Sequence, residues 1–243
     1  MIDKNSSSDK SRQSALFMDV LSHDVLNNNQ AVLSYLELIL AGPEMSARSR
    51  NYAEKAVSHI RASTVLVEDA NRLIAARTLD VNALKPFDLL KAVDYARKEL
   101  GGYFPAKRIK IHMEPGSKDL YVHGDTLVQH LVLNAFLDMV KLDPADDVIV
   151  KVRAMKAELN GRICWSLVLS DANAHLLPSM KSNLSELYMQ DSSKTVKLGG
   201  FLFVKTLAEL LGGKFEARES AFNAKRKDTG VEFVLTLEKR GKP

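Results

Sequence analysis

Residues 16–40 read LFMDVLSHDVLNNNQAVLSYLELIL, and this stretch decides the first part of the fold. Its apolar residues recur at spacings that alternate near three and four, which is typical of an amphipathic helix. They form one stripe: Met18, Leu21, Val25, Val32, Leu36 and Ile39. The pattern predicts a helix from about residue 13 to residue 40, and Gly42 and Pro43 then end it and start another.

The next periodic run covers residues 46–77 and predicts a second long helix after a tight turn, which gives an antiparallel hairpin. Its apolar stripe consists of Ala53, Ala56, Ile60, Val67, Ala70 and Ile74. Two such stripes are longer than two lone helices can cover mutually. We therefore expect a second copy of the chain to complete a dimeric four-helix bundle.

His23 lies opposite the apolar stripe of the first helix. At about 100° per residue it points about 180° away from the stripe, so it should face solvent. Asn27 follows one turn later on the same exposed face, and Asp24 flanks both. An imidazole beside a carboxylate can attack phosphorus, because its neutral form is populated near neutral pH and the carboxylate orients the ring. Geometry alone also allows an ordinary surface histidine.

The same stretch resembles the H-box of histidine-kinase dimerisation domains, and it looks most like archaeal members. The matching residues are Phe17, Ser22, His23, Asp24 and Asn27. The resemblance implies that His23 is the phospho-acceptor and that Asp24 is its acid/base partner. It also implies that Asn27 positions water when a response regulator is dephosphorylated. Asn28 stands near the place where the family usually has a proline that bends the helix.

The second half of the chain mixes helical and strand patterns. It predicts helices at about 88–100, 126–141 and 199–213, and strands at 108–114, 119–124, 147–155, 162–170, 214–219 and 230–238, with an irregular stretch at about 172–198. Neighbouring strands with helices between the groups indicate an α+β sandwich with helices on one sheet face. We expect a disordered tail at 1–11, a helical hairpin at 12–80 and an α+β domain at 81–243.

The second half resembles the ATP-binding domain shared by histidine kinases, Hsp90-type chaperones and gyrases. Residues 123–144, HGDTLVQHLVLNAFLDMVKLDP, look like the N-box helix. By that resemblance Asn134, Asp138 and Lys141 hold magnesium and phosphates, with Asn134 and Asp138 as the metal ligands. Asp138 stands where the family has a second asparagine; it keeps an oxygen ligand for Mg²⁺ but adds negative charge beside a triphosphate.

Two further motifs complete this resemblance. In LVLSDANAH, residues 167–175, Asp171 matches the aspartate that accepts a hydrogen bond from the adenine amino group, while Asn173 and His175 replace two family glycines. In KLGGFLFVKTLAELLGGKF, residues 197–215, Gly200 is the glycine that falls in register with the last glycine box. Backbone amides at such a helix start can hold phosphates.

Composition limits the other functions. The chain has 34 basic and 30 acidic residues, a mixed surface that argues against a nucleic-acid partner. Cys164 is the single cysteine, which excludes an internal disulfide, and its apolar neighbours predict a buried, inert thiol. No run approaches the ~18 apolar residues of a membrane span, and the polar N-terminus lacks a signal peptide. These features predict a cytoplasmic protein without a membrane segment.

Two phosphoryl-transfer hypotheses follow. In the first, the chain is a histidine kinase core that takes phosphate from ATP and Mg²⁺ onto His23 and passes it to an aspartate of a response-regulator receiver domain. In the second, it is a phosphorelay histidine phosphotransferase or a response-regulator phosphatase with a degenerate, non-ATP-binding second domain. A scaffold without phosphoryl chemistry is the third. All three fit a homodimer that receives its input from a separate sensor protein.

Overall fold

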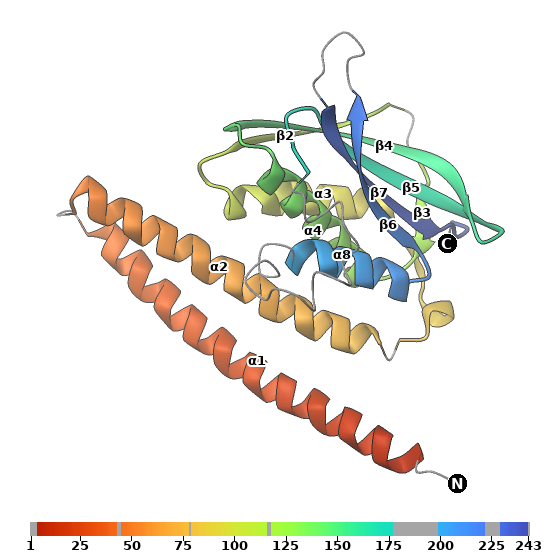
Figure 1. The fold of residues 1–243 in the computed structure, drawn as a ribbon, viewed down its shortest axis with the longest axis horizontal. Helices are drawn as coiled ribbons and strands as arrows, with labels where there is room; N and C mark the ends of the chain where they lie inside the picture. Colours follow the sequence, from red (N-terminus) through yellow and green to blue (C-terminus); the bar gives the residue numbers. More distant parts are fainter. Residues whose placement is uncertain are drawn as a thin grey trace. The chain divides into compact units, whose positions relative to one another are not determined.

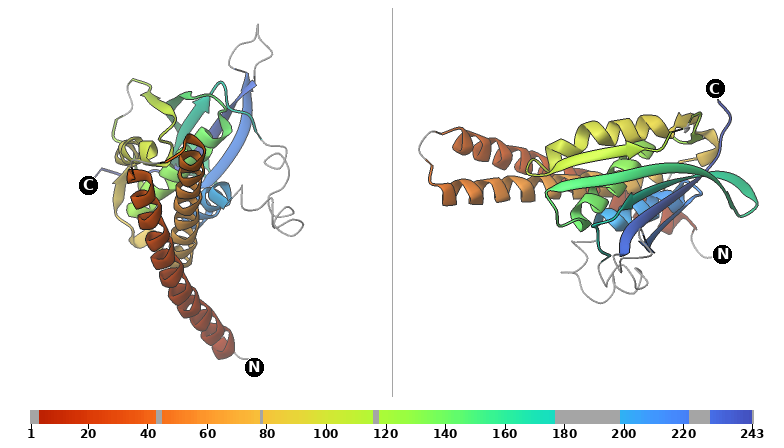
Figure 2. Two further views of the ribbon diagram at one scale, coloured as in Figure 1. Left: turned by 90° about the vertical axis from the view of Figure 1, so that its left-hand side faces the viewer. Right: turned by 90° about the horizontal axis from the view of Figure 1, so that it is seen from above.

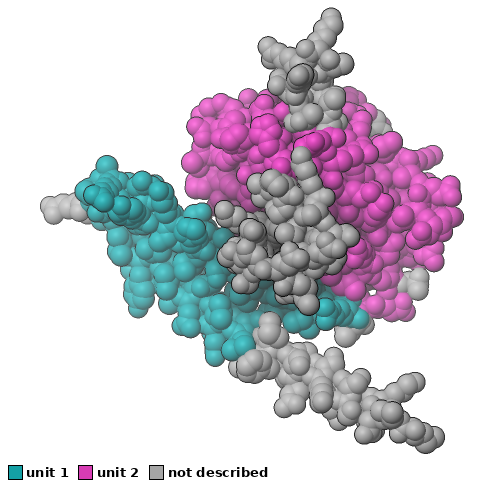
Figure 3. Space-filling model, in the orientation of Figure 1, with its two compact units in different colours: residues 1–78 teal, residues 79–243 magenta. Residues whose placement is uncertain are grey.

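The computed structural model describes residues 4–42, 45–77, 79–115, 118–176, 199–221 and 229–242. The chain divides into two compact units, residues 1–78 and residues 79–243, which Figure 3 colours separately. The division lies next to residue 80, where the sequence predicts a boundary. Part of the irregular stretch expected at 172–198 falls outside the described residues.

The first unit is an antiparallel hairpin of two long helices, as predicted (Figure 1). Helix α1 spans Lys4–Ala41 and helix α2 spans Ala47–Ala76. Ser46 caps α2, because its side chain accepts a hydrogen bond of 3.1 Å from the backbone N–H of Ser49. Helix α1 already includes residues 4–11, where the sequence predicts a disordered tail. Residues 4–41 contain neither proline nor glycine, so no helix-breaking residue stops α1 in that range.

The covered face of α1 differs from the predicted stripe. Its described buried and half-buried residues repeat at spacings of four and three: Ser22, Leu26, Asn29, Leu33, Leu36 and Leu40. Two polar layers join this face to α2: Ser22 Oγ donates to Asn71 Oδ1 at 2.8 Å, and Asn29 Nδ2 donates to the hydroxyls of Ser63 and Thr64 at 3.2 and 3.3 Å.

The predicted stripe itself is largely exposed within one chain. Leu21 is 42% exposed, Val25 38%, Val32 42% and Ile39 52%. Within one chain the adjacent stripe packs against α2, and it shares only Leu36 with the predicted stripe. Helix α1 thus carries two apolar stripes, one of which has no partner in the described part of the chain. A helix with apolar residues on two sides is typical of a bundle of more than two helices.

The second unit is built around a five-stranded sheet in the order β2-β4-β5-β7-β6. Strand β2 is parallel to β4, and the other neighbours are antiparallel. A separate pair joins β1 to β3 antiparallel. The strands are β1 Pro86–Asp88, β2 Arg108–Met113, β3 Tyr121–His123, β4 Asp147–Leu159, β5 Arg162–Asp171, β6 Lys214–Ala221 and β7 Thr229–Glu238. Helix η1 is Val81–Ala83, and the longer helices are α3 Leu89–Tyr103, α4 Thr126–Leu142 and α8 Gly199–Leu210.

The helices α3, α4 and α8 cover one face of this sheet, which confirms the predicted α+β architecture (Figures 1 and 2). The alternation along β4 shows why: Val148, Val150 and Val152 are fully buried, whereas the residues between them are exposed. The rings of Phe201 in α8, Phe215 in β6 and Phe233 in β7 pack edge to face, with centroids 5.0–5.8 Å apart.

Two smaller expectations can be compared with the fold. Cys164 lies in β5 and is 1% exposed, as the sequence predicts, and burial raises the pKa of its thiol. Among the described residues, no helix combines the length and the apolar character that a membrane crossing requires.

Candidate functional site

His23 lies on the solvent-facing side of α1 in contact with both residues predicted to assist it. Its side chain is 74% exposed and that of Asp24 is 70% exposed. Asp24 Oδ1 is 3.5 Å from His23 Nδ1. One helical turn further along, Asn27 Nδ2 is 3.2 Å from Nδ1 and 3.4 Å from Nε2. The structure therefore brings together a carboxylate, an amide and an open imidazole on one exposed surface.

The neighbour Ser22 fixes the direction in which His23 points. Ser22 is 4% exposed, and its hydrogen bond to Asn71 holds that side of α1 against α2. Successive helix residues are about 100° apart, so a buried residue 22 turns residue 23 outward. Sequence reasoning found Ser22 by its motif but missed Asn71 and the second polar layer at Asn29. The signal was present, because 22, 26, 29, 33, 36 and 40 follow the same spacing as the apolar stripe.

In the second unit, helix α4 places Asn134, Asp138 and Lys141 on consecutive turns. Asn134 is 2% exposed and its Nδ2 donates to the backbone oxygen of His130 at 3.1 Å. Asp138 is 4% exposed, and Lys141 Nζ donates to its Oδ1 at 3.0 Å. Burial raises the pKa of Asp138, and the Lys141 ammonium opposes that rise. Asp138 Oδ2 is buried without a hydrogen-bond partner.

The carboxylate of Asp138 faces the start of α8. A Cβ atom placed on Gly200 would lie 2.5 Å from Asp138 Oδ1 and 2.7 Å from Oδ2, closer than a side chain can approach. Glycine at 200 therefore makes room for this carboxylate. The first turn of a helix carries free N–H groups and partial positive charge, which favour an anion. The chain's own carboxylate therefore lies beside the first turn of α8.

Asp171 ends β5 and is 1% exposed. Its Oδ1 accepts from the backbone N–H groups of Asn173 and Ala174 at 2.8 and 3.3 Å, and its Oδ2 is buried without a hydrogen-bond partner. Burial is the main cause that raises the pKa of Asp171 to about 6, and the nearby Asp143 carboxyl raises it further. The hydrogen bonds from the two backbone donors oppose this rise. Among the described non-glycine residues, Asp119 and Asn160 are the ones with positive φ. Asn173 and His175 therefore both have negative φ. These two positions therefore do not need glycine here.

Sequence reasoning missed Asp143, the C-cap residue that follows α4 and lies beside Asp171. Asp143 is 1% exposed, and its Oδ1 accepts from the N–H of Ala145 at 2.7 Å. Lys107 holds this loop by donating to the backbone oxygens of Asp143 and Ala145 at 2.5 and 3.0 Å. The backbone N–H of His175 also donates to Leu142 O at 3.2 Å, which ties the loop after Asp171 to the loop of Asp143.

The residues predicted to hold Mg²⁺ and ATP fit these ligands to different degrees. Mg²⁺ prefers about six oxygen ligands, often shared with phosphates and water. Asp138 Oδ2 is one suitable oxygen, but no cluster of three or more His, Cys, Asp or Glu side chains that could hold a metal occurs among the described residues. Asp171 Oδ2 could accept a hydrogen bond from an amino group. The phosphate end fits less well, because the Asp138 carboxylate already faces the α8 start.

Together, the hairpin with an exposed histidine and the sandwich with an N-box-like helix have the architecture of a sensor histidine kinase core. Comparison with solved structures supports this fold. Full-length ShkA in complex with AMPPNP matches 93% of this chain at 17% identity and a TM-score of 0.58. This chain spans 46% of the length of ShkA. The likeness is one of fold.

Other solved structures that match are histidine kinases by name. The mycobacterial sensor histidine kinase MprB covers 65% of this chain with all of its own length, at 19% identity and a TM-score of 0.47. The Acinetobacter baumannii histidine kinase AdeS covers 89% of this chain with 98% of its own length, at 12% identity and a TM-score of 0.44. No family model and no curated protein sequence matches the chain.

Proposed function

We propose that the chain is a histidine kinase core that carries a phosphoryl group on His23 and transfers it to an aspartate of a receiver domain. The observation that supports this most directly is the exposed imidazole in contact with Asp24 and Asn27. A phosphoryl group must enter and leave through proteins or domains that dock on the histidine, so the imidazole has to be accessible. Its 74% exposure meets that requirement.

The contacts suggest how the ring acts. Asp24 lies beside Nδ1 and can hold the Nδ1 proton, which leaves Nε2 unprotonated as the nucleophile. The Nε2–P bond forms as the bond between the γ-phosphorus of ATP and its bridging oxygen breaks, and ADP is the leaving group. The imidazolium that forms can pass its Nδ1 proton to Asp24. In the dephosphorylation of a receiver, Asn27 can position the water that attacks the aspartyl phosphate, and inorganic phosphate is released.

ATP would be recognised in the second unit by Asp171 at the base and by Lys141 with Asn134 near the phosphates, and Mg²⁺ would neutralise phosphate charge. A cytoplasmic location follows from this proposal, since ATP and receiver proteins are found there. A homodimer belongs to it as well. The exposed stripe of Leu21, Val25 and Val32 would pack against a second copy, as in a four-helix bundle.

A second candidate function is favoured by the contact between Asp138 and Gly200. A carboxylate against the α8 start opposes the binding of a phosphate there by like charge. In this alternative the second unit binds no nucleotide. The helical unit then receives phosphate from one receiver and passes it to another, or removes it with Asp24 and Asn27. His23 has the same role in both candidates, and only the phosphate donor differs.

One experiment tests the proposal and separates the candidates. Purified chain is incubated with γ-labelled ATP and Mg²⁺, and in parallel with a phosphorylated receiver domain. A kinase should gain acid-labile label from ATP, a relay only from the receiver, and His23→Gln should gain none from either. His59→Gln, which removes another exposed histidine of the same unit, is the control and should behave as wild type. If neither donor labels the wild type and receiver dephosphorylation is not accelerated, both candidates are wrong.

A further inference from the structure

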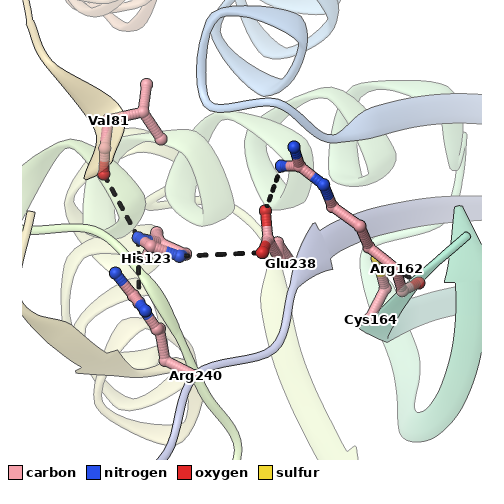
Figure 4. A network of polar contacts seen from close by, with 6 residues as sticks. All are labelled: Val81, His123, Arg162, Cys164, Glu238 and Arg240. Carbon is pink, nitrogen blue, oxygen red and sulfur yellow. Dashed lines mark hydrogen bonds and ion pairs between the residues drawn. The ribbon is translucent and has the colours of Figure 1, made fainter. Parts of the chain in front are cut away.

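Two buried ionisable groups of the second unit differ in how they are paired. His123 of β3 is 5% exposed. Its ring has partners at 3.1–3.9 Å, which are Val81, Arg240 and Glu238 (Figure 4). Asp138 of α4 is 4% exposed and accepts from Lys141 at Oδ1, but among the described residues its Oδ2 has no hydrogen-bond partner. A buried carboxylate oxygen without a donor is unfavourable, so this oxygen indicates a ligand from outside the chain.

The free oxygen of Asp138 lies at the start of α8. Gly200 permits this close approach, because a Cβ atom there would lie 2.7 Å from Oδ2. The first turn of α8 carries N–H groups that have no acceptor within the helix, and such a helix start favours an anion. A phosphate that binds at this helix start would therefore meet the Asp138 carboxylate.

The charges near Asp138 do not favour a phosphate by themselves. Lys141 Nζ lies 3.0 Å from Asp138 Oδ1, so the ammonium and the carboxylate form a pair without net charge. A divalent cation bound to Oδ2 would give this group a net positive charge. Mg²⁺ prefers carboxylate, phosphate and water oxygens as ligands. The same carboxylate therefore opposes phosphates without a cation and favours them with one.

We propose that Asp138 makes phosphate binding in the second unit conditional on a divalent cation. Without the cation, the Asp138 carboxylate repels phosphates from the α8 start. With a cation on Oδ2, Asp138 no longer opposes them and instead holds the ion that they share. Recognition of the base by Asp171 does not depend on the cation. This cation requirement rests on the proposed function in one respect, namely that the second unit binds ATP.

Calorimetry of the full chain with the ATP analogue AMPPNP and with adenosine, each in Mg²⁺ and in EDTA, tests the cation requirement. Wild type should bind AMPPNP about 100-fold more weakly in EDTA, near the upper end of the usual coupling between two ligands. Asp138→Asn removes the charge and should lose about tenfold or less. Adenosine carries no phosphate, so its affinity should be the same with and without the cation in both proteins. An equal loss in wild type and Asp138→Asn would overturn the proposal.

Binding of Mn²⁺ alone provides a measurement without nucleotide. Mn²⁺ takes carboxylate and water ligands as Mg²⁺ does, and its paramagnetic resonance signal reports the free ion. Wild type should bind Mn²⁺ at a site that Asp138→Asn weakens by about tenfold or more, the effect of losing one charged ligand. Asp94→Asn removes an exposed carboxylate of α3 and should match the wild type. Asp138→Ser is a second neutral variant, with a shorter side chain, and should behave like Asp138→Asn. Equal Mn²⁺ binding by wild type and both Asp138 variants would show that Oδ2 is not a ligand.

The outcomes also separate this proposal from the proposed function. If neither AMPPNP nor adenosine binds in Mg²⁺, the ATP-dependent candidate is wrong and the cation requirement is wrong with it. If wild type binds AMPPNP equally well in Mg²⁺ and in EDTA, the ATP-dependent candidate stands and only the cation requirement is wrong.

Discussion

The candidate functional residues are exposed in the helical hairpin and buried in the α+β unit. On the helical hairpin, His23 and Asp24 are 74% and 70% exposed and contact each other across the helix surface. In the α+β unit, Asp138 and Asp171 are 4% and 1% exposed, and each keeps one oxygen without a hydrogen-bond partner. Burying a carboxylate is unfavourable unless it is fully paired. Substitutions at the first site should therefore change transfer with little effect on stability, whereas substitutions at the second should change both.

The largest expected effect separates the stabilities of the two units. Phe233 is fully buried, with ring contacts to Phe201 and Phe215. Phe233→Ala leaves a cavity and should lower the unfolding free energy of the second unit by about 3 to 5 kcal/mol. The chain has one tryptophan, Trp165 in β5, so its fluorescence reports on this unit.

The hairpin should tolerate that change. Its far-ultraviolet helical signal and the acceptance of phosphate by His23 from a phosphorylated receiver should stay close to wild type in Phe233→Ala. If Phe233→Ala reduces phosphate acceptance by His23 as well as the stability reported by tryptophan fluorescence, the two units do not unfold independently. The comparison between them would then fail.

The next effect depends on pH. The pKa of Asp171 is raised to about 6 from 3.8, so between these values the folded chain binds more protons than the unfolded chain. Stability should therefore fall as pH rises from about 4 to 6 and stay level above that. At pH 7.5 the ionised carboxyl is unfavourable by up to about 3 kcal/mol. Asp171→Asn should recover part of this, because the amide oxygen still accepts from Asn173 and Ala174.

Urea unfolding at pH 4.5 and pH 7.5 measures this difference. Asp171→Asn should be more stable than wild type at pH 7.5, and the advantage should shrink at pH 4.5. Asp146→Asn changes an exposed carboxylate near Asp143 in sequence and should show no such dependence. A variant that is less stable than wild type at both pH values would show that the Asp171 carboxylate contributes to stability.

A somewhat smaller effect concerns the approach of Asp138 to α8. Gly200→Ala places a methyl group against the Asp138 carboxylate and should destabilise the second unit by about 1 to 3 kcal/mol. Gly101→Ala has no atom within 4 Å of its new Cβ and should be neutral or slightly stabilising. Shortening the acid should rescue the loss, so Gly200→Ala with Asp138→Ser should be more stable than Gly200→Ala alone. Without this rescue, the contact does not require glycine.

The sequence predicted the helical site better than the buried one. Helix geometry relates residues of one helix by fixed angles, so the exposure of His23 and its neighbours could be calculated from spacing alone. The fold class and most strands followed from periodicity, but the three-residue strand β1 is too short to give a pattern. Spacing could not decide which of two stripes on α1 packs against α2. Both stripes have the same period and share Leu36, and the covered stripe is the one that includes the polar residues Ser22 and Asn29.

The buried site depends on contacts between elements that are distant in sequence. Nothing in the run KLDPAD indicates that Asp143 lies beside Asp171, because the pairing depends on how α4 and β5 end. In the same way, Gly200 was assigned to a phosphate site by its register with a glycine box. The structure shows that it also accommodates the Asp138 side chain. Tertiary packing determines both contacts, and local sequence patterns cannot predict that packing.

The smallest expected effect tests whether the hairpin site is independent of stability. Ser22→Ala removes the hydroxyl that donates to Asn71 Oδ1 and leaves that oxygen half-buried, so it should lower stability by about 1 kcal/mol. Ser34→Ala is the matched control, because Ser34 bonds only to Gln30 O on its own helix and is exposed, and it should change stability by less than about 0.5 kcal/mol. Both are measured by urea unfolding at one fixed protein concentration, since the stability of the proposed dimer would depend on concentration. Phosphate acceptance by His23 should stay within about twofold of wild type in both variants, because one lost hydrogen bond of this size does not reverse the packing of α1. A large loss of acceptance in Ser22→Ala alone would show that the polar layer orients His23 for transfer and does more than hold the two helices together.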